Sequence, residues 1–271
     1  MKVTLIQLTS HDNKAANIVH AENLLRRSIE ASRPDLVALP EVFTYHGGTV
    51  DGAKNSAETI PGGPAFEMLC QIAREYGVYV HGGSIGERDE DRFYNTTPVI
   101  NPRGELVVRY RKIHMFDVMT PDGKSYQESA TFTPGSDIVT YDVGDVRIGC
   151  TICYDLRFGE LFVALAKKGV QVIILPAAFT MMTGKDHWEA LLRARAIETQ
   201  CYVLAPGQVG SYFGGGVERM NYGNSMIIDP WGTVIARAQD GIGFVSAELD
   251  LAYLEKVRSD IPSNRNRVLG G

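Results

Sequence analysis

The sequence predicts one α/β domain in which a mixed β-sheet is covered by helices. Three observations support this fold class. Short apolar strands alternate with amphipathic helices, two strand pairs are joined by tight turns, and no Pro/Ser-rich linker or fixed-period repeat divides the 271 residues. The alternation favours parallel strands, and the two hairpins add antiparallel ones. We therefore expect a single domain over residues 1–271.

The apolar pattern and the turn residues place the elements of the first half in order. Apolar runs bounded by turn residues are typical of strands, and apolar residues three or four positions apart are typical of helices. Pro64 fits the first turn of a helix, where its missing N–H costs nothing. These signals predict strands at 2–8, 35–41 and 78–87, helices over 18–29 and from Pro64, and a hairpin over 97–112 with Asn-Pro-Arg-Gly as its turn.

The second half repeats this pattern. It predicts strands at 146–152, 170–175, 201–205, 225–229 and 243–249, and helices at 159–168, 186–199 and 251–260. The strand at 225–229 opens a second hairpin, with Asp-Pro-Trp-Gly as its turn. We interpret the glycine-rich segment 212–223 as a mobile surface loop, and whether it closes over a site is left open.

Composition and charge exclude several classes of protein. Hydrophobic residues make up 44% of the chain and charged residues 22%, which suits a globular protein with a real core. The net charge of −5 and the lack of a basic block longer than Arg-Tyr-Arg-Lys argue against nucleic acid and anionic membranes as partners. No window approaches the ~20 apolar residues that span a bilayer, and the N-terminal apolar run is too short for a signal peptide. We expect a cytoplasmic protein, in which structural disulfides are rare.

Cys150 and Cys153 stand in a C-x-x-C spacing that allows three interpretations. A zinc site needs a second pair of ligands, and neither the other cysteines nor the six histidines supply one at metal-binding spacing. A redox pair needs sulfur atoms that can meet, but strand alternation points the two side chains to opposite faces. The third interpretation is one nucleophile, Cys153, with Cys150 as a small hydrophobic residue of the sheet.

Cys153 lies where an α/β protein exposes a reactive side chain, after a strand and before a helix. A thiol of ordinary pKa ~8.5 is mostly protonated at neutral pH, so a nucleophile needs a base and a cation beside it. Glu41 ends the strand at 35–41 and Lys112 ends the first hairpin, which makes both candidates. Taken singly, each is more often a solvated surface residue than a catalytic one.

Three short blocks in order connect these residues. Leu-Pro-Glu-Val-Phe at 39–43, Tyr-Arg-Lys-Ile-His-Met-Phe-Asp at 110–117 and Cys-Tyr-Asp-Leu-Arg-Phe-Gly-Glu-Leu at 153–161 resemble the signature blocks of the nitrilase superfamily, the carbon-nitrogen hydrolases. The resemblance covers essentially the whole chain. It implies a four-layer α-β-β-α sandwich and a homodimer or higher homo-oligomer that forms through the helices after Cys153. It also implies a catalytic triad of Glu41, Lys112 and Cys153.

The chemistry that the resemblance implies is covalent catalysis without a metal or organic cofactor. Glu41 would be the general base for Cys153, and Lys112 with the backbone N–H of Tyr154 would stabilise the oxyanion. A second glutamate of the family matches Glu128, which would hold Lys112 or the substrate amide in place.

Similarity to the amidase branch of the family implies a small acid with a terminal amide as substrate, as for omega-amidases and deaminated-glutathione amidases. Arg157 is a candidate partner for a substrate carboxylate, although a salt bridge to Glu160 or Asp155 explains it equally well. Sequence position suggests three pocket walls, Tyr45, Phe179 and Thr180. A nitrilase or an N-carbamoyl amide hydrolase would use the same triad, and the alternatives outside enzymes are a thiol redox sensor and a scaffold protein.

Overall fold

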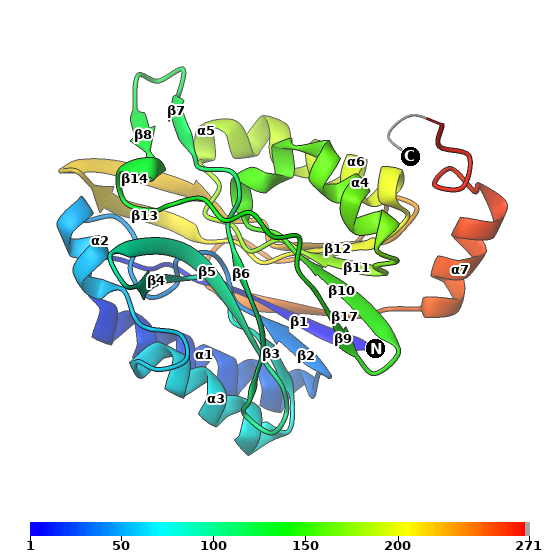
Figure 1. Cartoon of the computed structure of the whole chain (residues 1–271), viewed down its shortest axis with the longest axis horizontal. Helices are drawn as coiled ribbons and strands as arrows, with labels where there is room; N and C mark the ends of the chain where they lie inside the picture. Colours follow the sequence, from blue (N-terminus) through cyan, green and yellow to red (C-terminus); the bar gives the residue numbers. More distant parts are fainter. Residues whose placement is uncertain (269–271) are drawn as a thin grey trace.

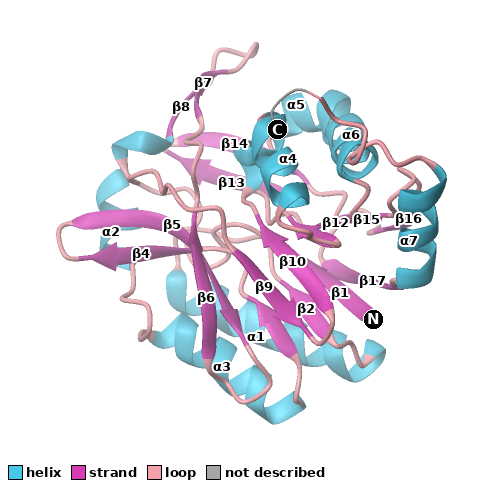
Figure 2. Ribbon diagram, turned by 45° about the vertical axis from the view of Figure 1, so that its right-hand side comes forward, coloured by secondary structure: helices cyan, strands magenta, loops and turns pink. Residues whose placement is uncertain are grey.

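Two large β-sheets form the centre of the molecule in a computed structural model that describes residues 1–268 (Figures 1 and 2). The first sheet has the order β17-β1-β2-β3-β5-β4, with β6 paired to β5. β1, β2 and β3 are parallel, and the other pairs are antiparallel. Its strands are β1 (Lys2–Gln7), β2 (Leu36–Ala38), β3 (Tyr79–His81), β4 (Ile85–Asp89), β5 (Arg92–Ile100), β6 (Leu106–Arg111) and β17 (Gly243–Glu248).

The second sheet has the order β16-β15-β12-β11-β10-β9, with β10, β11 and β12 parallel. Its strands are β9 (Thr140–Val143), β10 (Val146–Cys150), β11 (Val172–Ile174), β12 (Tyr202–Ala205), β15 (Met226–Ile228) and β16 (Val234–Arg237). Two small antiparallel hairpins stand at one end of the molecule (Figure 1). They are β7 (Asp117–Met119) with β8 (Ser125–Gln127), and β13 (Val209–Gly214) with β14 (Val217–Tyr222).

Helices cover the outer face of each sheet, which confirms the expected four-layer α-β-β-α sandwich (Figure 2). α1 (Lys14–Ser32) and α3 (Pro64–Tyr76) cover the first sheet, and α4 (Gly159–Lys167) and α6 (Glu189–Thr199) cover the second. The remaining helical segments are α2 (Val50–Ser56), η1 (Glu128–Ala130), η2 (Cys153–Arg157), α5 (Met181–Thr183), the π-helical turn η3 (Gly184–Trp188) and α7 (Leu251–Asp260). Within residues 1–268, no helix combines the length and the hydrophobicity that crossing a membrane requires.

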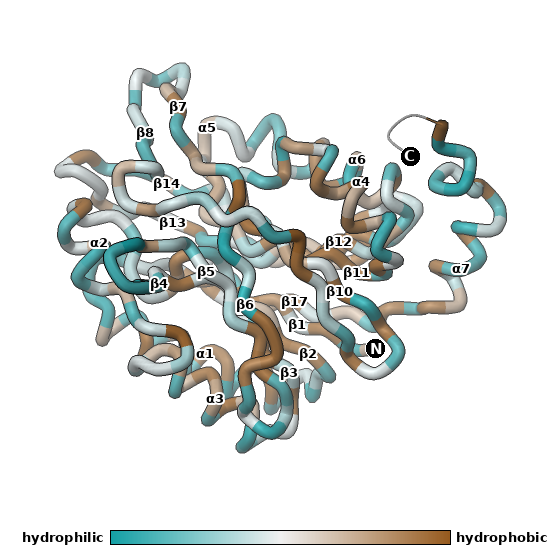
Figure 3. The backbone as a smooth tube through the Cα atoms, viewed as in Figure 1, coloured by the Kyte–Doolittle hydropathy of each residue, from teal (hydrophilic) through white to brown (hydrophobic). Residues whose placement is uncertain are grey.

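Strand alternation divides the apolar residues between two cores. Val3 and Leu5 of β1 pack in the core that contains residues of both sheets, whereas Ile6 packs with Leu25 of α1 in the core under the first pair of helices. Hydrophobic residues accordingly gather along the strands in the middle of the molecule (Figure 3). Cys150 is fully buried among the residues of the first of these cores, which fits its interpretation as a small hydrophobic residue.

The strand expected at 78–87 is divided into β3 and β4. Gly83, between them, has a φ of +58°, and a Cβ atom there would lie 2.1 Å from the carbonyl oxygen of Pro40. Only glycine permits this approach, and it lets the chain turn beside the segment that leads to Glu41.

The prediction that 212–223 is a surface loop is wrong. Most of the segment belongs to the β13–β14 hairpin, in which Val209 pairs with Tyr222 and Gly214 with Val217. Gly215 and Gly216 have φ values of +61° and +75° and form its turn. The glycines therefore mark the reversal of a hairpin and not a disordered connection.

Leu5→Ala tests the core between the sheets. The side chain is fully buried, and its truncation leaves a cavity, so we expect the free energy of unfolding to fall by about 2–5 kcal/mol. Urea denaturation followed by circular dichroism measures the change. Val107→Ala on β6, at a position that is 39% exposed, is the matched control and should cost less than about 0.5 kcal/mol. Equal effects of the two substitutions would contradict this description of the core.

Candidate active site

Three strand ends bring the candidate residues together. Glu41 follows β2, Lys112 follows β6, and Cys153 follows β10. The carboxyl ends of parallel strands share one edge of a sheet, where α/β proteins place their sites. These three residues and Glu128 line one cavity of about 290 Å³.

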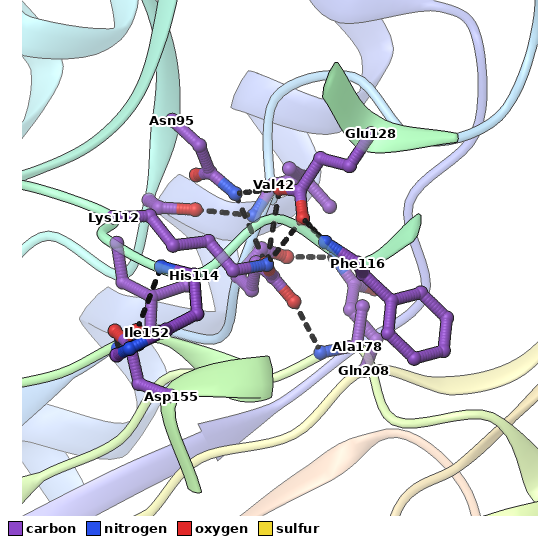
Figure 4. A network of polar contacts seen from close by, with 12 residues as sticks. Val42, Asn95, Lys112, His114, Phe116, Glu128, Ile152, Asp155, Ala178 and Gln208 are labelled. Atoms are coloured by element: carbon purple, nitrogen blue, oxygen red, sulfur yellow. Dashed lines mark hydrogen bonds and ion pairs between the residues drawn. The ribbon is translucent and has the colours of Figure 1, made fainter. Parts of the chain in front are cut away.

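The ammonium group of Lys112 lies between two carboxylates. Its Nζ donates to Glu41 Oε1 at 2.8 Å, and to Glu128 Oε2 and Oε1 at 2.7 and 3.0 Å (Figure 4). Lys112 is only 1% exposed. Burial lowers its pKa, but the charges of Glu128 and Glu41 outweigh burial and raise the pKa of Lys112 well above 10.5. The group is therefore a permanent cation.

Glu41 is held by two further donors. Its Oε1 also accepts from Asn95 Nδ2 at 3.0 Å, and its Oε2 accepts from the backbone N–H of Ala178 at 2.8 Å. Burial raises the pKa of Glu41, whereas the charge and hydrogen bond of Lys112 lower it, and the result lies below 4.5. Glu41 is thus an ionised carboxylate at neutral pH and can accept a proton.

Cys153 opens η2 in an uncommon backbone conformation. Its φ of +44° lies in the left-handed region, which costs a residue with a side chain about 1–2 kcal/mol. Val42, next to Glu41, has a φ of +47°, so both sides of the cavity contain such a residue. Burial and the Glu41 carboxylate raise the pKa of the Cys153 thiol well above 9.0, against the opposing charge of Lys112. The resting pair is a neutral thiol beside a carboxylate.

Asp155 connects two parts of the site. One is the turn that contains Cys153, and the other is the strand that leads to Lys112. Its Oδ2 accepts from the Tyr110 hydroxyl at 2.6 Å and from the backbone N–H of Ile152 at 2.8 Å. Its Oδ1 accepts from the backbone N–H of His114 at 3.1 Å and lies 2.7 Å from His114 Nδ1 (Figure 4). From the sequence, Asp155 is expected only as a possible salt-bridge partner of Arg157. Its place two residues after the nucleophile was the available signal.

The structure separates the residues that were predicted to bind substrate. Tyr45 and Thr180 line the cavity. Tyr154, Arg157 and Phe179 are not among its lining residues, and the Arg157 guanidinium lies 5.3 Å from the ring centroid of Phe179 and 6.0 Å from that of Tyr154. A substrate contact of these three residues stays a prediction.

Sequence reasoning missed the residues that the small hairpins contribute. Tyr126 of β8, Tyr212 of β13 and Arg219 of β14 line the cavity, together with His46. Burial lowers the pKa of His46 to about 4, so its ring is neutral at neutral pH. No motif marks these positions, and two of them fall in the segment that was taken for a loop.

Comparisons with known proteins identify the family. The carbon-nitrogen hydrolase family model matches residues 2–259. The omega-amidase NIT2-B of Xenopus laevis is 40% identical over 270 residues, which cover 98% of this chain and 94% of that protein. The deaminated glutathione amidase of Synechocystis sp. is 38% identical over 268 residues, with 97% and 96% covered. Saccharomyces cerevisiae Nit3, a member of branch 10 of the nitrilase superfamily, has a solved structure that matches with a TM-score of 0.86 at 33% identity, over 97% of this chain and 94% of that one. The chain belongs to the carbon-nitrogen hydrolase family and is a hydrolase that acts on carbon–nitrogen bonds.

Proposed function

We propose that this amidase removes the terminal amide of a small carboxylic acid and releases ammonia through a thioester on Cys153. The observation that supports this most strongly is the buried ammonium of Lys112 between Glu41 and Glu128, in the cavity that Cys153 lines. Buried ion clusters contribute little net stability, because the cost of desolvation offsets the attraction. Their position in a cavity therefore favours a catalytic role.

In the first half of the reaction, Glu41 takes the proton of the Cys153 thiol, and the thiolate attacks the carbonyl carbon of the amide. A C–S bond forms, and the carbonyl oxygen becomes an oxyanion. Lys112 and the backbone N–H of Tyr154 stabilise this charge, and one such donor typically contributes ~10²–10³ in rate. The C–N bond then breaks as Glu41 returns the proton to nitrogen, and ammonia leaves.

In the second half, Glu41 takes a proton from water, and the water oxygen attacks the thioester carbonyl. The C–S bond breaks, the free acid leaves, and the proton returns to the sulfur of Cys153. Glu128 keeps Lys112 oriented throughout. Its own carboxylate is fixed by the backbone N–H of Phe116, which donates to Oε2 at 2.7 Å. This arrangement favours a preorganised cation over one that must move during the reaction.

The substrate class follows from the relatives and the size of the cavity. Two of the relatives are named omega-amidase and deaminated glutathione amidase, and a cavity of about 290 Å³ suits a small acid amide. Hydrolysis of a nitrile or of an N-carbamoyl compound would use the same triad, so both compounds should be assayed as substrates beside the amides. A homodimer through α4 and α6 and a cytoplasmic location also stay predictions.

Cys153→Ala should abolish ammonia release from α-ketoglutaramate and deaminated glutathione. We expect a loss of more than ~10³-fold, because the covalent route needs the sulfur. Mass spectrometry of the quenched wild-type reaction should show an acyl adduct on the peptide that contains Cys153. Cys150→Ala is the matched control and should keep its activity. Ammonia release that survives in Cys153→Ala, or an adduct on Cys150, would contradict the proposal.

The pH dependence of kcat/KM tests the pairing of Glu41 with Lys112. Because the pKa of Glu41 lies below 4.5, we expect the activity to persist as the pH falls and to drop only when this carboxylate is protonated. Lys112→Gln removes the cation that lowers this pKa and leaves the burial that raises it. The acid limb should therefore move to higher pH, and the rate should fall by ~10²–10³.

The control for this profile is Lys256→Gln, at an exposed lysine of α7 that pairs with Asp260. It should leave both the rate and the acid limb unchanged. Circular dichroism at each pH separates titration of the site from unfolding. An acid limb that stays in place in Lys112→Gln would show that Lys112 does not set the pKa of the base.

A further inference from the structure

We propose that Arg219 binds the carboxylate of the substrate in the catalytic cavity and so selects acid amides over neutral amides. The inference rests on the proposed function. Arg219 lies in β14 and lines the same cavity as Cys153 and Glu41.

The guanidinium of Arg219 has donors that the protein does not use. Its Nη2 donates to the carbonyl oxygen of Ser125 at 2.9 Å, and its Nε to that of Gly214 at 3.4 Å. Its Nη1 is buried and has no hydrogen-bond partner within residues 1–268. Of about five N–H donors in a guanidinium, these two bonds leave three, on the adjacent nitrogens Nη1 and Nη2. N–H groups on two adjacent guanidinium nitrogens can bind a carboxylate with two parallel hydrogen bonds.

An unused buried donor requires an explanation. Leaving one without a partner is destabilising, and native proteins keep few of them. Arg111, by contrast, pairs with the carboxylates of Glu87 and Asp89. No carboxylate of residues 1–268 forms an ion pair with Arg219. A carboxylate that arrives with the substrate would complete the set.

The side chain is also held in place before any ligand binds. Its Cζ lies 4.1 Å from the ring centroid of Tyr126, and the bond to Ser125 reaches the same strand, β8. The guanidinium thus connects the two small hairpins, which lie side by side in both ribbon views (Figures 1 and 2). A group that is already oriented loses less entropy when it binds a ligand.

The charge of the cavity points to the same role. Glu41 and Glu128 together with Lys112 leave one formal negative charge, and the neighbouring ring of His46 is neutral. A substrate carboxylate near these groups would be repelled without a second cation. Among the lining residues, Arg219 supplies that cation.

Arg157 is the competing candidate for this role. It does not line the cavity, and it packs over Phe179 and Tyr154, while its Nη1 lies 3.3 Å from Nδ1 of His187. Its surroundings are aromatic rings and a histidine. The two arginines are therefore tested side by side.

Succinamate and butyramide separate the two roles that Arg219 can have. They share the chain length and the reacting amide, and they differ in a carboxylate against a methyl group. In Arg219→Gln, we expect KM for succinamate to rise about 10²-fold with kcat little changed, because binding is lost equally in the ground and transition states. The kcat/KM for butyramide should stay within about threefold of the wild-type value. Arg219→Lys keeps the positive charge but cannot form two parallel hydrogen bonds to a carboxylate. Its KM for succinamate should therefore lie between those of the wild-type protein and Arg219→Gln.

Two further variants act as controls. Arg147→Gln, at an exposed arginine of β10 that pairs with Asp142, should leave kcat and KM unchanged for both substrates. Equal losses on succinamate and butyramide in Arg219→Gln would mean that Arg219 only connects the hairpins, and this would overturn the proposal. A selective loss in Arg157→Gln in place of Arg219→Gln would overturn it as well.

Binding of succinate, measured by calorimetry, keeps this inference separate from the proposed reaction. If the wild-type protein releases no ammonia from any amide, the proposed function fails, but the binding site can still be measured. Succinate should then bind the wild-type protein and Cys153→Ala, and it should bind Arg219→Gln about 10²-fold more weakly. Absence of binding to the wild-type protein, or equal binding to Arg219→Gln, overturns the role of Arg219.

Discussion

The ammonium of Lys112 stays buried only while two carboxylates face it, and this requirement connects the two sheets. Glu41 follows β2 of the first sheet, and the N–H of Ala178 that fixes it follows β11 of the second. Loss of one partner leaves a buried charge without compensation, which typically costs about 3–5 kcal/mol. The sandwich therefore has to bring these strand ends to the same place before the charges can be buried at all.

The strained residues at this edge are held by their surroundings. The N–H of Val42 donates to Ser84 Oγ at 2.9 Å, and the N–H of Cys153 donates to the carbonyl oxygen of Pro176 at 2.8 Å. Asp155 fixes the end of the same turn through four contacts to Tyr110, His114 and the backbone. Backbone conformations that cost energy persist where neighbours define them this strongly. The thiol is thereby aimed at the cavity before a substrate enters.

The sequence predicts many of the strands, the covering helices and the candidates at strand ends because these depend on local patterns. The two-sheet sandwich and the triad followed from the resemblance to the nitrilase superfamily. The end of a strand can be predicted from the sequence, and Glu41 and Cys153 were candidates because they lie at such ends. Asn95 is different, because it lies in the middle of β5, and only the pairing of that strand decides that it bonds to both Glu41 and Glu128. Arg219 was not predicted as a site residue for another reason. Glycines at the turn of a hairpin have the same composition as a loop, so the pattern alone does not show the strand that contains it.

The cavity is built from two parts with different mechanical support. The residues proposed to react lie at the edges of the sheets, whose strands are packed in the cores on both faces. The residues proposed to select the substrate lie on the β7–β8 and β13–β14 hairpins, which carry exposed side chains such as Met119, Phe213 and Met220. Elements outside the core tolerate substitution better than core strands do. Residues of the hairpins can therefore change the part of the substrate that is recognised while the strand ends keep Glu41 and Cys153 in place. Lys112 is also held by Glu128, which directly follows β8, so the base of that hairpin belongs to the reacting part of the cavity.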